Sequence, residues 1–200
     1  MAIDENNAVT WVYAGRNEDA KGNYDAAIDK YNYAAKLDPN YSSAFSFRAA
    51  TYMKVRKYRE ACQDAISALS IDRNTKAFLQ LFELADSAME FLSPQLKAQQ
   101  LKEPNESQWS YYLGLMQKSK GDFTQAEKAF KEALRISQFE GDTSTLLYQN
   151  LAETLNEIGK FNEAIDITDA AVRIDSTESR TWRDRAEIYY NVSSTNFLLK

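Results

Sequence analysis

The sequence of 200 residues contains no histidine and a single cysteine, Cys62. The absence of histidine removes the side chain that most often serves as a general base or a metal ligand near neutral pH. One cysteine cannot form an internal disulfide, which is typical of a reducing compartment. We therefore expect a cytoplasmic protein in which Cys62 has a packing role, with no metal site and no cofactor.

Basic residues are also in the minority, because 24 Lys and Arg stand against 29 Asp and Glu, leaving a formal net charge of -5. Nucleic acid is not expected as a partner, since binding to phosphates needs clustered cations. No stretch approaches the roughly 18 uncharged apolar residues of a membrane span, and the first residues lack the basic flank and apolar run of a secretory signal. Membrane insertion and export are not expected either.

Motifs that carry chemistry are missing as well. No glycine-rich phosphate-binding loop occurs. Acidic pairs such as Glu153 and Glu157, one helical turn apart, are interpreted as a solvated helix face rather than as an acid/base pair, because nothing nearby supplies a third group. The sequence indicates that the chain is not an enzyme.

What the sequence does contain is a repeat. Four similar segments begin at aromatic residues, and in each an alanine follows the aromatic residue after three positions and another after ten. An apolar residue after thirteen positions keeps the set on one helical face. A period of about 34 residues is the signature of stacked helix pairs. The aromatic residues that open the second helices are Tyr24, Tyr58, Phe123 and Phe161.

A small residue precedes each of these aromatic residues by nine positions and marks the first helix of each pair. Two antiparallel helices pack about 8–10 Å apart only where the side chains at the crossing are small. We therefore expect a bulky ring of the facing helix to pack against each small residue: Gly15, Ala49, Gly114 and Ala152.

The turn between paired helices carries its own signal. Gly22, Gly121 and Gly159 stand two positions before the aromatic residue, where a helix end adopts the left-handed backbone that glycine tolerates. In the second segment Arg56 takes this place. We expect the turn there to be slightly strained or differently shaped.

This pattern resembles the tetratricopeptide repeat (TPR). The resemblance implies an all-α fold, a right-handed superhelix of antiparallel helix pairs (a TPR α-solenoid) with a C-terminal capping helix. We expect one domain with repeats at about 8–41, 42–75, 76–106, 107–140 and 145–178, a capping helix at 179–192 and a tail at 193–200. Repeat one carries most of the signature: Trp11, Gly15, Gly22, Tyr24, Ala27, Tyr31, Ala34, Leu37 and Pro39.

Two segments depart from the pattern. Residues 76–106 lack the glycine-containing turn and are interpreted as a degenerate helix pair, with Ser93 as the N-cap and Pro94 as the first residue of the second helix. Residues 177–192 look like a first helix without a partner, with Trp182, Ala186 and Tyr189 in register.

The resemblance implies a non-catalytic adaptor that binds a peptide or partner segment in a concave groove lined by the first helices. Exposed aromatic residues are enriched at interfaces, so Phe47, Tyr111 and Tyr112 are expected to contribute most. A suitable partner would carry apolar residues beside one or two acids. The groove positions of the family, carried onto this sequence, are Arg16, Phe47, Lys76, Gln80, Gln108, Tyr111, Tyr112, Lys118, Gln149, Asn150, Arg180 and Arg183.

Two alternatives remain open. Repeat two looks like the repeats of TPR co-chaperones, which hold the acidic C-terminal tail of heat-shock chaperones with Lys, Asn and Arg side chains. Only Lys76 agrees with that clamp, and without the asparagines and a second arginine a bidentate grip on two carboxylates is not expected. The positions of this chain that correspond to the clamp residues are Val12, Arg16, Phe47, Lys76 and Gln80.

The other alternative is a helical-repeat subunit of a larger enzyme or complex.

Overall fold

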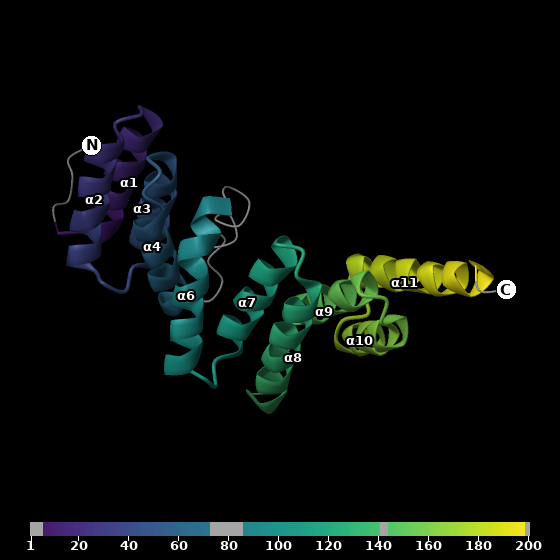
Figure 1. Cartoon of the computed structure of the whole chain (residues 1–200). Helices are drawn as coiled ribbons and strands as arrows, with labels where there is room; N and C mark the ends of the chain where they lie inside the picture. Colours follow the sequence, from purple (N-terminus) through teal and green to yellow (C-terminus); the bar gives the residue numbers. More distant parts are fainter. Residues whose placement is uncertain (1–5, 73–85, 141–143, 199–200) are drawn as a thin grey trace. The chain divides into compact units, whose positions relative to one another are not determined.

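The computed structural model describes residues 6–72, 86–140 and 144–198. These ranges contain ten α-helices and no strand (Figure 1). The predicted all-α class is therefore confirmed. The helices are α1 (Ala8–Ala20), α2 (Tyr24–Leu37), α3 (Ser42–Lys54), α4 (Tyr58–Ile71), α6 (Asp86–Lys102), α7 (Ser107–Ser119), α8 (Phe123–Glu140), α9 (Thr145–Glu157), α10 (Phe161–Ile174) and α11 (Ser179–Leu198).

The chain divides into two compact units, Met1–Leu96 and Lys97–Lys200. In the first unit α1 packs against α2, α2 against α3, and α3 against α4. In the second unit α7 packs against α8, α8 against α9, and α9 against α10, while α11 packs against both α10 and α9. The four helices that begin at the repeated aromatic residues are thus the second members of their pairs.

The small residues of the repeat form the tight contacts between paired helices. At Gly15 on α1 an added Cβ would lie 2.5 Å from Cε1 of Tyr31, whose ring is 1% exposed. Gly15 thus admits the ring of the second helix, as the spacing predicted, and Gly114 on α7 admits the ring of Phe130 on α8 in the same way. Every repeated alanine of the second helices is completely buried: Ala27, Ala34, Ala61, Ala68, Ala126, Ala133, Ala164 and Ala171.

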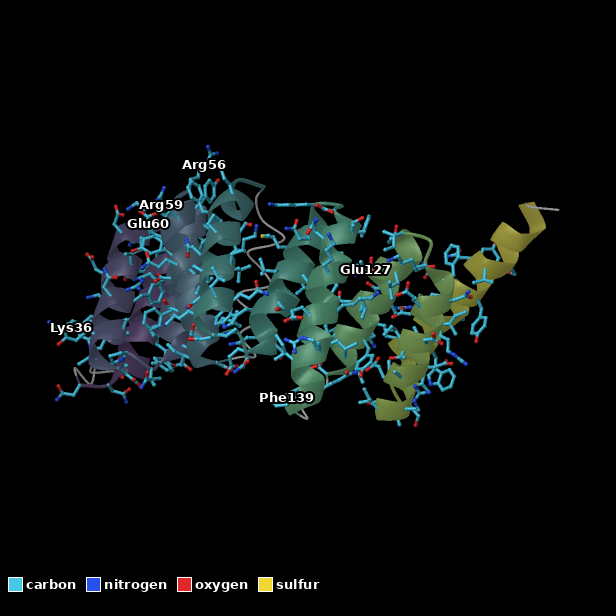
Figure 2. The ribbon with its side chains drawn as sticks, turned by 60° about the horizontal axis from the view of Figure 1, so that its bottom comes forward. Lys36, Arg56, Arg59, Glu60, Glu127 and Phe139 are labelled. Atoms are coloured by element: carbon cyan, nitrogen blue, oxygen red, sulfur yellow. The ribbon has the colours of Figure 1, made fainter. Side chains whose placement is uncertain are left out.

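The turns between paired helices adopt the predicted left-handed backbone. Gly22, Gly121 and Gly159 have φ angles of 81°, 75° and 75°. At the equivalent turn Arg56, labelled in Figure 2 near Arg59 of α4, has a φ of 60°. No other non-glycine residue in the described ranges has a positive φ. Because an L-residue adopts this conformation at an energetic penalty, the expected strain at this turn is confirmed.

Helix α6 corrects the interpretation of residues 93–106. Pro94 does not begin a helix but lies inside α6, and Ser93 is not a cap. The apolar face continues across the proline, since Leu92 and Leu96 are 1% and 0% exposed. Burying two leucines stabilises by about 3–6 kcal/mol, which matches or exceeds the roughly 3 kcal/mol that an interior proline costs. The earlier part of this predicted pair, residues 76–85, lies outside the described residues.

Helix α11 is also longer than predicted, because it continues to Leu198 rather than ending at residue 192. Its Trp182 and Tyr189 are 44% and 47% exposed. Arg185 lies along them, with its guanidinium carbon 5.6 Å and 5.3 Å from the two ring centroids, and donates from Nε to Asp169 Oδ1 at 2.7 Å. This face of α11 therefore combines two exposed aromatic rings with a paired cation.

Candidate protein-binding groove

The second unit contains an open groove with a volume of about 730 Å³. It is formed by the first helices α7, α9 and α11 and by the start of α8. Three residues predicted from the sequence, Lys118, Asn150 and Arg183, line it. The complete lining is Leu115, Lys118, Ser119, Phe123, Asn150, Glu153, Asn156, Glu157, Arg183, Asp184, Glu187 and Ile188.

Glu153 holds two of the cations that the sequence predicted to contact a ligand. Arg180 donates from Nη2 to Glu153 Oε1 at 2.7 Å, and Lys118 forms an ion pair with the other carboxylate oxygen. Burial by itself would raise the pKa of Glu153, but the hydrogen bonds from Lys118 and Arg180 bring that pKa below its usual value. The chain thus supplies its own carboxylate between Lys118 and Arg180.

Asn150 of α9 connects two of the helices that form the groove, α9 and α7. Its Oδ1 accepts from Lys118 Nζ at 3.0 Å, while its Nδ2 donates to the Leu146 carbonyl at 2.9 Å and to Tyr111 Oη at 3.2 Å. Asn150 is 6% exposed. Its amide is therefore already engaged in hydrogen bonds that tie α9 to α7.

The two tyrosines of α7 do not form the exposed aromatic surface that the sequence predicted. Tyr112 is buried, because with Trp109 and Met116 it falls on the apolar face of α7 at helical spacing. Tyr111 is half-buried, with its ring centroid 5.9 Å from that of Phe130. Burial raises the pKa of Tyr111, so its hydroxyl stays protonated.

Two predicted glutamines have different surroundings. Gln149 is buried and donates from Nε2 to Thr181 Oγ1 at 2.9 Å, which ties α9 to α11. Gln108 on α7 is half-buried, and its Oε1 has no hydrogen-bond partner among the described residues. Lys76 and Gln80 lie outside the described residues.

The first unit brings together the two residues predicted there. The Arg16 guanidinium lies 4.8 Å from the centroid of the Phe47 ring, which in turn stacks on Tyr31 at 6.2 Å with an interplanar angle of 18°. One turn along, Asp19 accepts from Thr51 Oγ1 at 2.9 Å and pairs with Lys54. These contacts connect α1 to α3 on the face of the first helices.

Asp184 on α11 is a groove residue that the sequence reasoning missed, since only the cations of that helix were considered. Its side chain is 9% exposed, and its Oδ2 accepts no hydrogen bond. The nearest cations are Arg180 and Arg183, each with Nε 3.9 Å from one of its oxygens. Burial first, and the charge of Glu153 second, raise the pKa of Asp184. The spacing of Arg180 and Asp184, four positions apart on one helix, was the signal available in the sequence.

Metal-binding and membrane-spanning features do not occur in the part of the chain that the structure describes. Within residues 6–72, 86–140 and 144–198, no cluster of three or more His, Cys, Asp or Glu side chains is arranged to hold a metal ion. None of the described helices combines the length and the apolar character needed to cross a membrane.

The pairing and the tight crossings define a helical-repeat protein, and the comparisons with known proteins agree. Residues 111–139 match the family model described as tetratricopeptide repeat. Stress-induced-phosphoprotein 1 of Caenorhabditis elegans is 24% identical over 189 residues, which cover 76% of this chain and 58% of that protein. Small glutamine-rich tetratricopeptide repeat-containing protein 2 of Saccharomyces cerevisiae is 38% identical over 58 residues, which cover 29% of this chain and 17% of the relative. The chain thus spans less than two thirds of the length of these relatives.

Solved structures show the same fold. The TPR protein TTC0263 of Thermus thermophilus has a TM-score of 0.55 at 19% identity, with 92% of this chain and 99% of that chain covered. Yeast Tom70 has a TM-score of 0.60 at 18% identity, with 94% and 40% covered. YrrB, described as a TPR protein with an unusual peptide-binding site, has a TM-score of 0.51 at 15% identity, with 92% and 94% covered. The chain carries tetratricopeptide repeats.

Proposed function

We propose that this chain is a non-catalytic adaptor that holds a segment of a partner protein in the groove between α7, α9 and α11. The observation that carries the proposal is the groove itself, about 730 Å³ in volume and lined by side chains of three successive first helices. Several helices contribute, so an extended segment can contact each of them in turn. A protein of the same fold, YrrB, is described as having a peptide-binding site.

The composition of the groove supports a peptide rather than a small apolar ligand. Leu115 and Phe123 give apolar surface, while carboxylates and the amide of Asn156 surround it. Peptides present both apolar side chains and hydrogen-bonding groups, whereas apolar small molecules leave such polar walls unsatisfied. We also propose a cytoplasmic location, because the single cysteine, Cys62, is a free and buried thiol.

A narrower function, binding of the acidic tail of a heat-shock chaperone, is favoured by the similarity to stress-induced-phosphoprotein 1 along 76% of this chain. The described clamp positions argue against it. Val12 is 2% exposed, and Arg16 lies against the Phe47 ring. We therefore place this function second. The remaining alternative is that the chain is a helical-repeat subunit of a larger enzyme or complex.

Panning a random dodecapeptide library on the chain, followed by calorimetric titration of the enriched peptides, tests the adaptor function. Ser119→Trp introduces a large ring into the groove from an exposed position of α7. Gln63→Trp introduces the same ring at an exposed position of α4 in the other unit and serves as the matched control.

We expect the enriched peptides to bind the wild type and Gln63→Trp equally, and to bind Ser119→Trp at least about tenfold more weakly, a change of roughly 1.4 kcal/mol. Circular dichroism verifies that both variants are folded. Failure to enrich any peptide, or equal binding to Ser119→Trp, would overturn the proposed groove.

A further inference from the structure

We propose that the groove of the second unit receives a basic side chain of the partner segment, an arginine or a lysine. Its charged end would lie against Asp184 and Glu187 of α11, and its aliphatic stem against Leu115 and Phe123. The inference rests on the proposed function and specifies the chemistry of the partner.

The charge of the groove is the first argument. Four carboxylates line it, against two cations. Glu153 is paired with Lys118 and also with Arg180 of α11, so three cations in all stand against the four carboxylates. Glu157 and Glu187 are exposed and form no ion pair within the described part of the chain. The net charge presented to a ligand is therefore negative, and it favours a cation.

Asp184 is the second and independent argument. It lines the groove, is 7% exposed, and carries an oxygen, Oδ2, that accepts no hydrogen bond, because the nearest cationic atom, Arg180 Nε, lies 3.9 Å away, beyond hydrogen-bond distance. A buried carboxylate oxygen without a hydrogen-bond donor is unfavourable. The guanidinium of arginine and the ammonium of lysine are the protein groups that donate best to such an oxygen, because the hydrogen bond is charge-assisted.

An acidic ligand does not fit the same surface. The two cations that a ligand carboxylate would need, Lys118 and Arg180, both donate to Glu153. Arg183 is 73% exposed and lies next to Asp184, with 3.9 Å between Nε and Oδ1. A carboxylate entering the groove would displace Glu153 or meet its charge. The proposed partner charge is therefore opposite in sign to the one expected from the sequence.

The apolar walls suit the stem of a long cation. Leu115 and Phe123 are half-buried and Ile188 is 2% exposed, all in the lining of the groove. Lys and Arg bury their methylene groups on apolar surface while the charged end stays with polar partners. A short cation or a metal ion would leave these walls unused.

The experiment uses the dodecapeptides enriched on the wild-type chain, with each basic residue replaced in turn by glutamine. Asp184→Asn and Glu187→Gln each remove one groove charge, and Asp166→Asn removes an exposed carboxylate on α10, outside the groove, as the matched control. Affinities are measured by fluorescence anisotropy at low and at high salt.

We expect enrichment of Arg or Lys, and a loss of about tenfold or more when Asp184→Asn or the glutamine peptide is used, as for a charge-assisted hydrogen bond. Glu187→Gln should weaken binding by roughly two- to fivefold, as for an exposed pair, and high salt should weaken it further. Asp166→Asn should leave the affinity unchanged. If Asp184→Asn does not fold, the inference is tested by the exposed Glu187→Gln variant and by the peptides whose basic residues are replaced by glutamine.

The outcomes separate the two proposals. Acidic or neutral peptides that bind, and that Ser119→Trp blocks, would overturn the basic-ligand inference while the adaptor function stands. Basic peptides that bind equally well to the wild type, Asp184→Asn and Glu187→Gln would overturn that inference too. Peptides that Ser119→Trp does not block would overturn both proposals.

Discussion

A methyl group added at Gly114 of α7 would lie 2.5 Å from Cδ1 of Phe130 on α8. Phe130 is completely buried, so its ring has no solvent-filled space into which to move. The glycine at this crossing is therefore required for close approach of the two helices. The same relation joins Gly15 to Tyr31 in the first unit.

Gly114→Ala is expected to destabilise the chain by about 1–3 kcal/mol through overpacking. Alanine is the better helix former by roughly 1 kcal/mol, so its helix propensity alone would stabilise the chain. A loss of stability therefore shows that the steric contact with Phe130 dominates. Urea unfolding followed by circular dichroism measures it. In a Phe130→Leu background the smaller side chain should remove most of the penalty, and a double-mutant cycle quantifies the coupling. A Gly114→Ala protein more stable than the wild type would show that the crossing is looser than described.

The turn at Arg56 predicts a stabilising substitution. Arg56→Gly should raise stability by roughly 0.5–1 kcal/mol, because glycine adopts a φ of 60° without the clash of a Cβ. The reciprocal control is Gly22→Ala, where nothing lies within 4 Å of an added Cβ but φ is 81°. That variant should lose stability by about 1 kcal/mol from backbone strain alone. Thermal unfolding of both proteins checks the pair, and changes of equal sign would contradict the explanation.

Pro94 makes a third prediction, because it is exposed and lies within α6. Pro94→Ala restores an N–H donor to the helix and removes the clash with the preceding turn, so we expect stability to rise by about 1–3 kcal/mol. Pro39→Ala, at an exposed proline between α2 and α3, frees the unfolded chain without adding a helical hydrogen bond. It should leave stability unchanged or lower it slightly. Chemical denaturation of the two variants, side by side, gives the comparison.

The crossings could be predicted from the sequence because each depends on residues at fixed spacing within one repeat. The partner of Gly15 is Tyr31, and both belong to the same helix pair, so the period alone places them together. Pro94 was misassigned because the local Ser-Pro signal of a helix start does not include the burial of Leu92 and Leu96. The burial of these two leucines outweighed the local preference of Ser-Pro for a helix start.

The charge of the groove could not be predicted in the same way. Glu153 joins Lys118, 35 positions before it, and Arg180, 27 positions after it, so the neutralisation depends on three repeats stacking in register. The sequence named all three side chains but did not predict the ion pairs between them. Tyr112 was assigned to the surface for a related reason, since burial of a residue on a first helix depends on which face its neighbours cover.

The last prediction concerns the pH dependence of stability, because two of the four groove carboxylates, Glu153 and Asp184, have pKa values shifted in opposite directions. The pKa of Glu153 is lowered overall, with burial opposing the hydrogen bonds from Lys118 and Arg180. A lowered folded-state pKa means that the stabilisation is present above the unfolded-state value of about 4.5 and is lost as the pH falls through the folded value. The stability difference between the wild type and Glu153→Gln should therefore be largest at neutral pH and shrink in acid.

Asp184 should behave in the opposite way, since burial, and then the charge of Glu153, raise its pKa. Its charged form is unfavourable in the folded chain, so the penalty is present at neutral pH and disappears as the pH falls through the raised folded value towards the unfolded value of about 3.9. Relative to the wild type, Asp184→Asn should gain at neutral pH and lose that gain in acid, while Glu153→Gln moves the other way. Urea unfolding at pH 7 and at about pH 4 measures both differences, with Asp166→Asn, at an exposed position of α10 outside the groove, as the control. Parallel pH profiles for the two groove variants would show that Glu153 does not act as the carboxylate shared by Lys118 and Arg180.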